Sequence, residues 1–311
     1  MKLSAVIESY IGFKQGLGMR LDSQATMLRA FGRALKDIEM ARVKPSAVQA
    51  FFDSKRPVTA NLRNYFSVIN NFYRYAVSRG FATAIPLPTT LPKIPPPAVP
   101  YIYTVENLRS LLIATDVLKT RRCPWRGREF RTFLLLLYGT GLRFGEAVSL
   151  TLHDVDLTTA VITVRNGKNF KSRLVPIGPK LTQELVEYAK GRRDRQPRSL
   201  GNDSAFFVNS RGARWKSRAT HTYFRIVCRR AGIIRKGDSH CRQPRLHDLR
   251  HTAAQHRLEA WYQEGKDVQR MLPQLATFLG HRDIAQLQYY LHMTPELLRA
   301  ASQRFEGYAQ P

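Results

Sequence analysis

Proline concentrates in one stretch of this sequence, residues 86–97, where it occupies six of twelve positions. Proline has no backbone N–H and its ring clashes with the preceding helical turn, so this stretch cannot form a helix and is too proline-dense for a central strand. It predicts a semi-rigid linker between two domains. We place a helical domain at residues 1–88, the linker at 89–102 and a second domain at 103–311.

The first domain is predicted to be helical because its apolar residues recur at helical spacing. The first set is Leu3, Val6, Ile7, Tyr10 and Ile11. Asp22 and Ser23 are expected to cap a second helix, and Pro45 suits the first turn of a third. A longer helix is expected from Thr59 to Ser78, with Gly80 as its stop.

The second domain combines helical patterns with a short β pattern. Thr104 is expected to cap a helix that ends at Ala114, and an apolar helix over 130–138 should be central and stop at the glycines of 139–141. Residues 160–164 alternate as a strand, 172–177 as its antiparallel partner, and 166–171 supply the turn. A third short strand is expected at 205–208. The predicted fold class is therefore mainly α with a small antiparallel β-sheet.

Charge narrows the class of partner. The chain has 50 Lys+Arg against 23 Asp+Glu, a formal net charge of +27. Such a charge favours a polyanion, with nucleic acid as the first candidate and a membrane surface as the second. The longest apolar run, residues 133–138, is far shorter than the roughly 20 residues of a membrane span, so no membrane association is expected. The N-terminus predicts no secretory signal, and Cys123, Cys228 and Cys241 form no C-x-x-C pair, which favours a cytoplasmic protein with reduced thiols.

Residues 245–252 carry the most informative motif. At the start of a helix, His247 and Arg250 would stand at positions i and i+3 and project from one face towards one anion. Upstream, Arg143 opens a predicted helix with Glu146 three residues on. These two residues could form only a surface pair worth about 0.2 to 0.5 kcal/mol, or the guanidinium could bind a phosphate in a bidentate manner.

Together with Leu279-Gly280-His281 and with Tyr290 nine residues after that histidine, these motifs resemble the tyrosine recombinases, the phage-integrase family of DNA strand-exchange enzymes. The resemblance implies a two-domain DNA clamp, with a helical core-binding domain and an α+β catalytic domain. The expected activity is that of a site-specific recombinase or integrase of a mobile element, which cuts and rejoins DNA by transesterification through a 3′-phosphotyrosine, without metal, ATP or another cofactor.

The resemblance also implies residue roles. Arg143 and Arg250 would neutralise the phosphate oxygens, with Glu146 as a supporting residue, while His247 and His281 would donate hydrogen bonds or handle a proton. Lys168, in a Gly-Lys pair at the turn, would be the general acid, with Lys171 as the fallback. Tyr290 would be the nucleophile, and its neighbour Tyr289 is expected only to pack.

Double-stranded DNA is the expected partner. The DNA-binding candidates are Arg225, Arg229, Arg230 and Arg245. Apolar residues are interleaved with the first three, which predicts a helix over about 220–231 that lies along the duplex with its apolar residues inside. The family further implies a nucleoid-associated homo-oligomer, tetrameric on DNA and a monomer or weak dimer away from it. Residues 294–311 predict a tail helix that docks either on its own domain or on a neighbouring protomer.

Alternative functions stay open. A type IB-like topoisomerase uses the same chemistry without exchanging partners, and a non-catalytic DNA-binding protein would keep the fold alone. A zinc site from His240, Cys241, His247 and His251 is disfavoured because no second pair of ligands has suitable spacing. The choice among integration, excision and resolution is likewise open.

Overall fold

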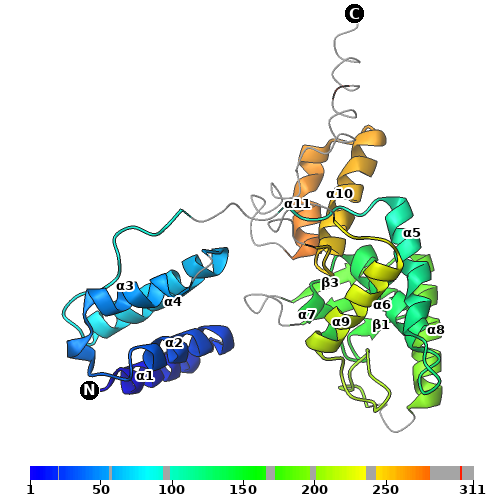
Figure 1. Ribbon diagram of the computed structural model, residues 1–311. Helices are drawn as coiled ribbons and strands as arrows, with labels where there is room; N and C mark the ends of the chain where they lie inside the picture. The colour runs from blue at the N-terminus through cyan, green and yellow to red at the C-terminus, as the bar shows by residue number, and fades with distance from the viewer. Residues whose placement is uncertain are drawn as a thin grey trace, which may run out of the picture. The chain divides into compact units, whose positions relative to one another are not determined.

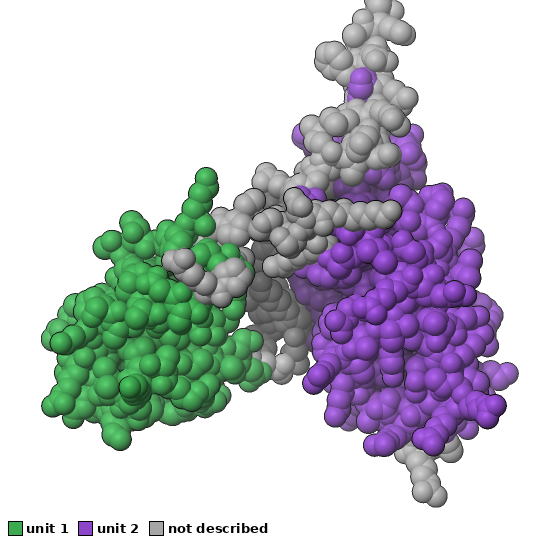
Figure 2. Space-filling view, in the orientation of Figure 1, with its two compact units in different colours: residues 1–97 green, residues 98–311 purple. Residues whose placement is uncertain are grey.

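The computed structural model describes residues 1–19, 21–55, 58–93, 99–165, 172–196, 201–235, 243–280 and 302. The chain divides into two compact units, Met1–Pro97 and Ala98–Pro311, which Figure 2 colours separately. Helices dominate both units and the sheet is small and antiparallel, which confirms the predicted fold class. Among the helices of these described ranges, none combines the length and apolarity needed to cross a membrane.

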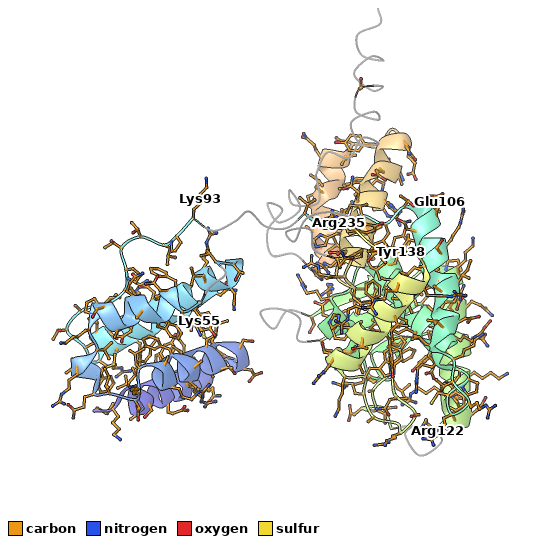
Figure 3. All side chains as sticks on the ribbon, viewed as in Figure 1. Lys55, Lys93, Glu106, Arg122, Tyr138 and Arg235 are labelled. Atoms are coloured by element: carbon orange, nitrogen blue, oxygen red, sulfur yellow. The ribbon has the colours of Figure 1, made fainter. Side chains whose placement is uncertain are left out.

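Unit 1 is a helical bundle. Its elements are α1 (Leu3–Gly16), α2 (Asp22–Ala34), the 3-10 helix η1 (Met40–Arg42), α3 (Pro45–Asp53) and α4 (Ala60–Ser78). The five apolar residues predicted for the first helix are the ones that α1 buries. Aromatic rings fill the centre: Phe31 and Phe51 meet edge to face with centroids 5.1 Å apart, and the Lys55 ammonium lies 4.5 Å from the Phe51 centroid (Figure 3). Such contacts stabilise the bundle in addition to the burial of the apolar ring surfaces.

The ends of these helices test the predicted caps. Pro45 occupies the first turn of α3, and Gly80 adopts φ +72° after α4, both as predicted. The prediction for Asp22 and Ser23 is wrong, because α2 begins at Asp22, follows Leu21 and has no side-chain cap. Asp22 instead lies within the first turn, where a carboxylate favours the helix dipole.

Unit 2 is organised around α6 (Arg126–Thr140). Packed against it are η2 (Thr115–Leu118), α7 (Phe144–Ser149), α8 (Pro179–Arg195) and α10 (Asp248–Gln263). Nine of the α6 residues are buried, so the predicted central helix is confirmed. The hydroxyl of Tyr138, which Figure 3 labels, makes a 2.8 Å hydrogen bond with His256 Nδ1 and so ties α6 to α10. Further helices cover this core: α5 (Val105–Ala114) lies against α9 (Ser217–Arg230), as Figure 1 shows.

The sheet has the order β1-β2-β3, from β1 (Val155–Asp156), β2 (Val161–Val164) and β3 (Arg173–Pro176). Pairing of β2 with β3 is antiparallel, as predicted. The third strand was predicted wrongly: β1 takes that place, and residues 205–208 make only isolated bridges to Thr151 and Arg214. Successive residues of a strand point to opposite faces of the sheet, but Phe206 and Phe207 are both buried. This segment therefore lines the core and does not extend the sheet.

A helical hairpin completes unit 2 and delivers the residues of the site. α10 continues to Gln263, Gly265 turns the chain at φ +67°, and α11 (Val268–Leu279) returns along α10. The two helices share an apolar cluster of their own, and α11 also packs on β3. At the other side of α10, the hydroxyl of Thr252 accepts from the backbone N–H of Tyr103 at 3.1 Å, which fixes the chain just before the capping box of Thr104 on α5.

Candidate active site

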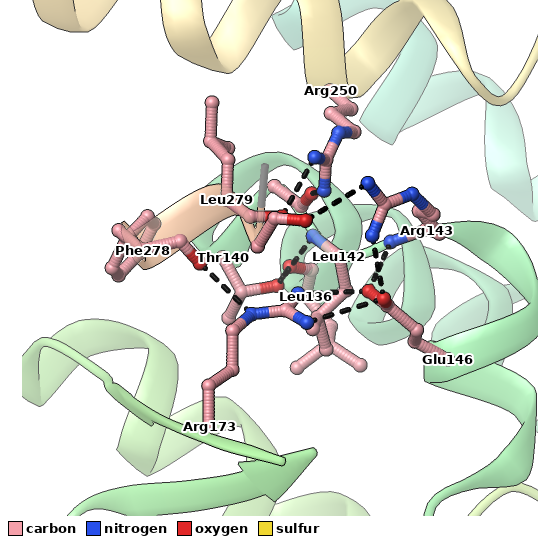
Figure 4. A network of polar contacts seen from close by, with 11 residues as sticks. Leu136, Thr140, Leu142, Arg143, Glu146, Arg173, Arg250, Phe278 and Leu279 are labelled. Carbon is pink, nitrogen blue, oxygen red and sulfur yellow. Dashed lines mark hydrogen bonds and ion pairs between the residues drawn. The ribbon is translucent and has the colours of Figure 1, made fainter. Parts of the chain in front are cut away.

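Three arginines from different elements meet at the carboxyl end of α11 (Figure 4). Each donates to one of three consecutive backbone carbonyl groups, and the pairs are Arg173 with Phe278 at 3.1 Å, Arg250 with Leu279 at 2.7 Å and Arg143 with Gly280 at 3.1 Å. The last carbonyl groups of a helix have no partner within the helix and carry its negative dipole end. The arginines therefore satisfy this helix end and are held by it.

Arg143 is placed by the break between two helices. α6 ends at Gly141, which adopts φ +60°, and Arg143 then occupies the cap position before α7 with extended backbone. Its N–H donates to Glu146 Oε2 at 3.0 Å and its Nη1 donates to Oε1 at 2.8 Å. These contacts fix the side chain at its base and its tip, and the supporting role of Glu146 stays a prediction.

Glu146 accepts from two arginines at once. Besides Arg143, Arg173 donates to it through Nη1 at 3.2 Å and Nη2 at 2.8 Å. Burial alone would raise the pKa of Glu146, but the hydrogen bonds from Arg173 and Arg143 and the charge of Arg173 outweigh it and hold the pKa at about 2. The carboxylate is therefore ionised throughout the neutral range.

Arg250 is the innermost of the three arginines, with 1% of its surface exposed. Its Nη1 donates to the Gly141 carbonyl at 2.6 Å, while its Nη2 reaches Leu279. It thereby joins the end of α6 to the end of α11. Because a buried charge is costly to leave without hydrogen bonds, these contacts explain how α10 can carry a guanidinium in its core-facing side.

His247 stands at the cap position of α10 and is exposed, unlike Arg250. Partial desolvation lowers the pKa of His247, and the charges of Arg250, Arg245 and Arg143 lower it further against the opposing charge of Asp248. The imidazole is therefore mostly neutral at pH 7, able to donate from one nitrogen and accept at the other. An anion bound beside His247 would offset these positive charges, raise the pKa of the imidazole and favour its protonated form.

Arg245 is partly a structural residue. Its backbone N–H and its Nη2 both donate to Asp248, at 2.8 and 2.9 Å, and Asp248 is buried. This ion pair closes the turn that precedes α10 and so holds His247 at the helix start. The side chain is 40% exposed, and its DNA contact stays a prediction.

The remaining predicted DNA contacts lie on α9. Arg225, Arg229 and Arg230 are exposed, while Phe224 and Val227 are buried, as predicted for a helix that presents its basic face. The prediction is wrong for Ile226, which lies beside Arg225 on the helix and is exposed. The helix begins at Ser217, three residues before the predicted start. The ring of His221 on α9 lies 4.9 Å from that of Phe144, the residue next to Arg143, so α9 is adjacent to the site.

Lys168, His281 and Tyr290 lie outside the described residues, as do Lys171 and Tyr289. Their catalytic roles therefore stay predictions. In sequence, His281 directly follows Gly280, whose carbonyl Arg143 holds, and Lys168 belongs to the segment that joins β2 to β3. Gly280, just before the segment of His281, and Arg173, shortly after the segment of Lys168, both belong to the arginine cluster.

Sequence reasoning missed Arg173. The signal was present: an arginine opens an otherwise apolar strand, where its partner strand places Val164 opposite it.

Within the described part of the chain, no group of three or more histidine, cysteine, aspartate or glutamate side chains could hold a metal ion.

Sequence comparison adds independent information. The family model described as the phage integrase family matches residues 114–296. A Sinorhizobium fredii protein named as an integrase/recombinase is 34% identical over 305 residues, which covers 96% of each chain. The tyrosine recombinase XerC of Oceanobacillus iheyensis is 32% identical over 250 residues, 80% of this chain and 73% of that protein.

Solved structures share the fold. The integrase of transposon Tn1549, in complex with transposon right-end DNA, superposes with a TM-score of 0.70 at 17% identity over 98% of this chain and 100% of that one. A lambda integrase tetramer bound to a Holliday junction superposes with a TM-score of 0.68 at 15% identity, over 95% of this chain and 80% of that one. At these identities the likeness concerns the fold.

Proposed function

The chain belongs to the phage integrase family of tyrosine recombinases, and from this membership we propose that it is a site-specific recombinase that cuts and rejoins DNA strands through a 3′-phosphotyrosine, without metal or ATP. The observation that carries the proposal is the convergence of Arg143 and Arg250 on the helix end that precedes His281. Two guanidinium groups fixed in one place suit a phosphate whose charge grows in the transition state.

The proposed reaction divides among residues as follows. The Tyr290 hydroxyl attacks the phosphorus, forms the 3′-phosphotyrosine and displaces the 5′ oxygen, so the bond energy is kept for rejoining. Arg143 and Arg250 stabilise the non-bridging oxygens, and His247 and His281 hydrogen-bond to them or handle the tyrosine proton. Lys168 gives a proton to the leaving oxygen. Glu146 holds Arg143 in place.

We infer double-stranded DNA as the partner, bound by both domains of the clamp. The net charge of +27 and the exposed arginines of α9 support this inference. The likeness to a transposon integrase solved on DNA supports DNA binding, and the likeness to a lambda integrase tetramer on a Holliday junction supports a tetramer on DNA. Away from DNA we propose a monomer or weak dimer, associated with the nucleoid in the cytoplasm.

The test is a covalent trap. Sheared genomic DNA of the source organism is incubated with the wild type, Tyr290→Phe and Tyr289→Phe, and the DNA that stays bound after denaturation is sequenced. Wild type and Tyr289→Phe should yield adducts at a shared site, and Tyr290→Phe should bind DNA equally well but yield none. Adducts lost only in Tyr289→Phe would move the nucleophile by one residue.

Further outcomes separate the alternatives. DNA binding by the wild type without any adduct would indicate a non-catalytic binder. Adducts with relaxation of supercoils, but without strand exchange between two fragments that carry the recovered site, would indicate the topoisomerase.

A further inference from the structure

Arg173 lies at the start of β3 and joins three parts of the site, although no role is assigned to it above. We propose that Arg173 is a positioning residue for strand cleavage: it fixes the carboxylate that orients Arg143 and holds the helix end that leads into His281. The proposal rests on the recombinase function proposed above.

The contact with Glu146 is bidentate and buried. Nη1 and Nη2 of Arg173 lie 3.2 and 2.8 Å from Oε1 and Oε2, and the two side chains are 10% and 8% exposed. A planar guanidinium matches a carboxylate in this fork geometry, and the exclusion of water strengthens the contact. Arg173 therefore fixes the plane of the carboxylate as well as its charge.

Each oxygen of that carboxylate is shared with Arg143. Oε1 also accepts from Nη1 of Arg143, and Oε2 also accepts from its backbone N–H. The two contacts from Arg143 both come from a residue three positions away in the chain. The two contacts from Arg173 come from a separate element, β3, and restrict the plane of the same carboxylate further. The carboxylate in turn restricts the orientation of the Arg143 guanidinium.

The remaining nitrogen of Arg173 reaches α11. Nε donates to the Phe278 carbonyl at 3.1 Å, one residue before the carbonyl group that Arg250 holds. Gly280 makes room for this approach: a Cβ there would stand 2.6 Å from Nη1 of Arg173, and the backbone has φ +70°. Residue 280 thus combines two features that favour glycine: the left-handed backbone that ends α11, and the close approach of the Arg173 guanidinium.

Arg173 consequently connects three segments that carry residues of the proposed mechanism. Glu146 belongs to α7, whose cap residue is Arg143, and Phe278 belongs to the helix that precedes His281 in sequence. Arg173 itself begins the strand that follows the segment of Lys168 in sequence. Misplacement of a catalytic group by about 1 Å can cost about 100-fold in rate. Loss of Arg173 should therefore affect the chemical step more than DNA binding.

The experiment compares Arg173→Met, Arg173→Lys and a matched control. The control, Arg195→Met, breaks another ion pair of unit 2, with the buried Glu129 at the opposite end of α6 from Gly141; the Arg195 side chain is 26% exposed. For each protein we measure thermal stability, affinity for sheared genomic DNA of the source organism, and the rate of covalent adduct formation at saturating DNA. The saturated rate separates positioning from weakened binding.

Arg173→Met should lose about 100-fold in saturated rate and change affinity less than about threefold. Arg173→Lys should lose about tenfold, because an ammonium keeps the charge but cannot bridge Glu146 and Phe278. Arg195→Met should keep the wild-type rate per folded molecule. If Arg173→Met does not fold, the lysine variant carries the comparison, and a wild-type rate in it overturns the proposal.

The two possible failures are distinguishable. A wild type without adducts overturns the recombinase function and this proposal with it. A wild type with adducts, beside an undiminished rate in folded Arg173→Met, overturns the positioning role alone. Combining Arg173→Lys with Glu146→Gln should cost less than the product of the two single losses, because both variants disturb the same carboxylate, and a fully multiplicative loss would overturn the route through Glu146.

Discussion

Gly141 and Leu279, at the ends of two helices that are distant in sequence, touch so closely that a Cβ on residue 141 would lie 2.5 Å from Leu279 Cδ2. Gly141 also has φ +60° and gives its carbonyl to Arg250. The glycine thus ends α6, leaves room for α11 and supplies one of the contacts that hold Arg250, for which we propose a catalytic role.

Gly141→Ala should therefore destabilise the fold by about 2 to 4 kcal/mol, from strain at positive φ together with the steric clash. Gly145→Ala is the control: it lies in α7, has open space around its Cβ position and should be neutral or stabilising by up to about 1 kcal/mol. Urea unfolding measures both. Equal free energies of unfolding for the Gly141 variant and the wild type would contradict the close contact.

Glu129 should make stability depend on pH. Burial raises the pKa of Glu129 to about 7 despite the opposing charges of Arg195 and Arg126. Since the folded pKa exceeds the unfolded value, the folded state binds the extra proton between about pH 4.5 and 7, and this contribution, up to about 3 kcal/mol, is lost as pH rises through that window.

Replacing Glu129 with Gln should remove that dependence. The free energy of unfolding of Glu129→Gln, relative to wild type, should rise between pH 5 and pH 8. Glu187→Gln is the control, because Glu187 pairs with Arg128 at the exposed edge of the same helix pair. Parallel pH profiles for Glu129→Gln and wild type would show that the carboxyl does not titrate in this range.

Lys168 is expected to protonate the leaving 5′ oxygen. An alkoxide needs a proton to leave, whereas a thiolate, whose thiol has a pKa of about 8.5, does not. Lys168→Ala should cleave an ordinary site poorly and recover most of its rate when the bridging 5′ oxygen is replaced by sulfur. Arg143→Ala should not recover, since it removes charge stabilisation.

Lys171→Ala is the control for that experiment and should behave alike on both substrates. Rescue of Lys171→Ala instead would shift the assignment by three residues. Rescue of neither lysine variant would make His281 the next residue to test.

Binding should be strongly electrostatic. The logarithm of affinity should fall with the logarithm of salt concentration, by about 0.9 for each phosphate contacted. Arg229→Gln and Arg230→Gln should each reduce that slope by about one unit. Arg128→Gln, whose guanidinium pairs with Glu187 at the exposed edge between α6 and α8, should leave it unchanged. A flat titration of the wild type would exclude a DNA clamp.

Sequence alone determined the local structure where apolar spacing is regular. The five apolar residues of the first predicted helix are the buried face of α1, and the paired strands and the stop at Gly141 also agree. Periodicity predicts these features because a face is set by the repeat of the backbone itself. The short motifs around Arg143 and Arg250 likewise identified the family.

Only the tertiary structure decided which partners these residues take. Arg143 meets the Gly280 carbonyl 137 residues away, Arg250 meets Gly141 across 109, and Arg173 meets Phe278 across 105. Such contacts depend on how helix ends pack against one another, which no local repeat encodes. For the same reason Arg173 seemed an ordinary strand residue in the sequence. Residues 205–208 are apolar enough for a strand, but they pack in the core around α6 and do not join the sheet.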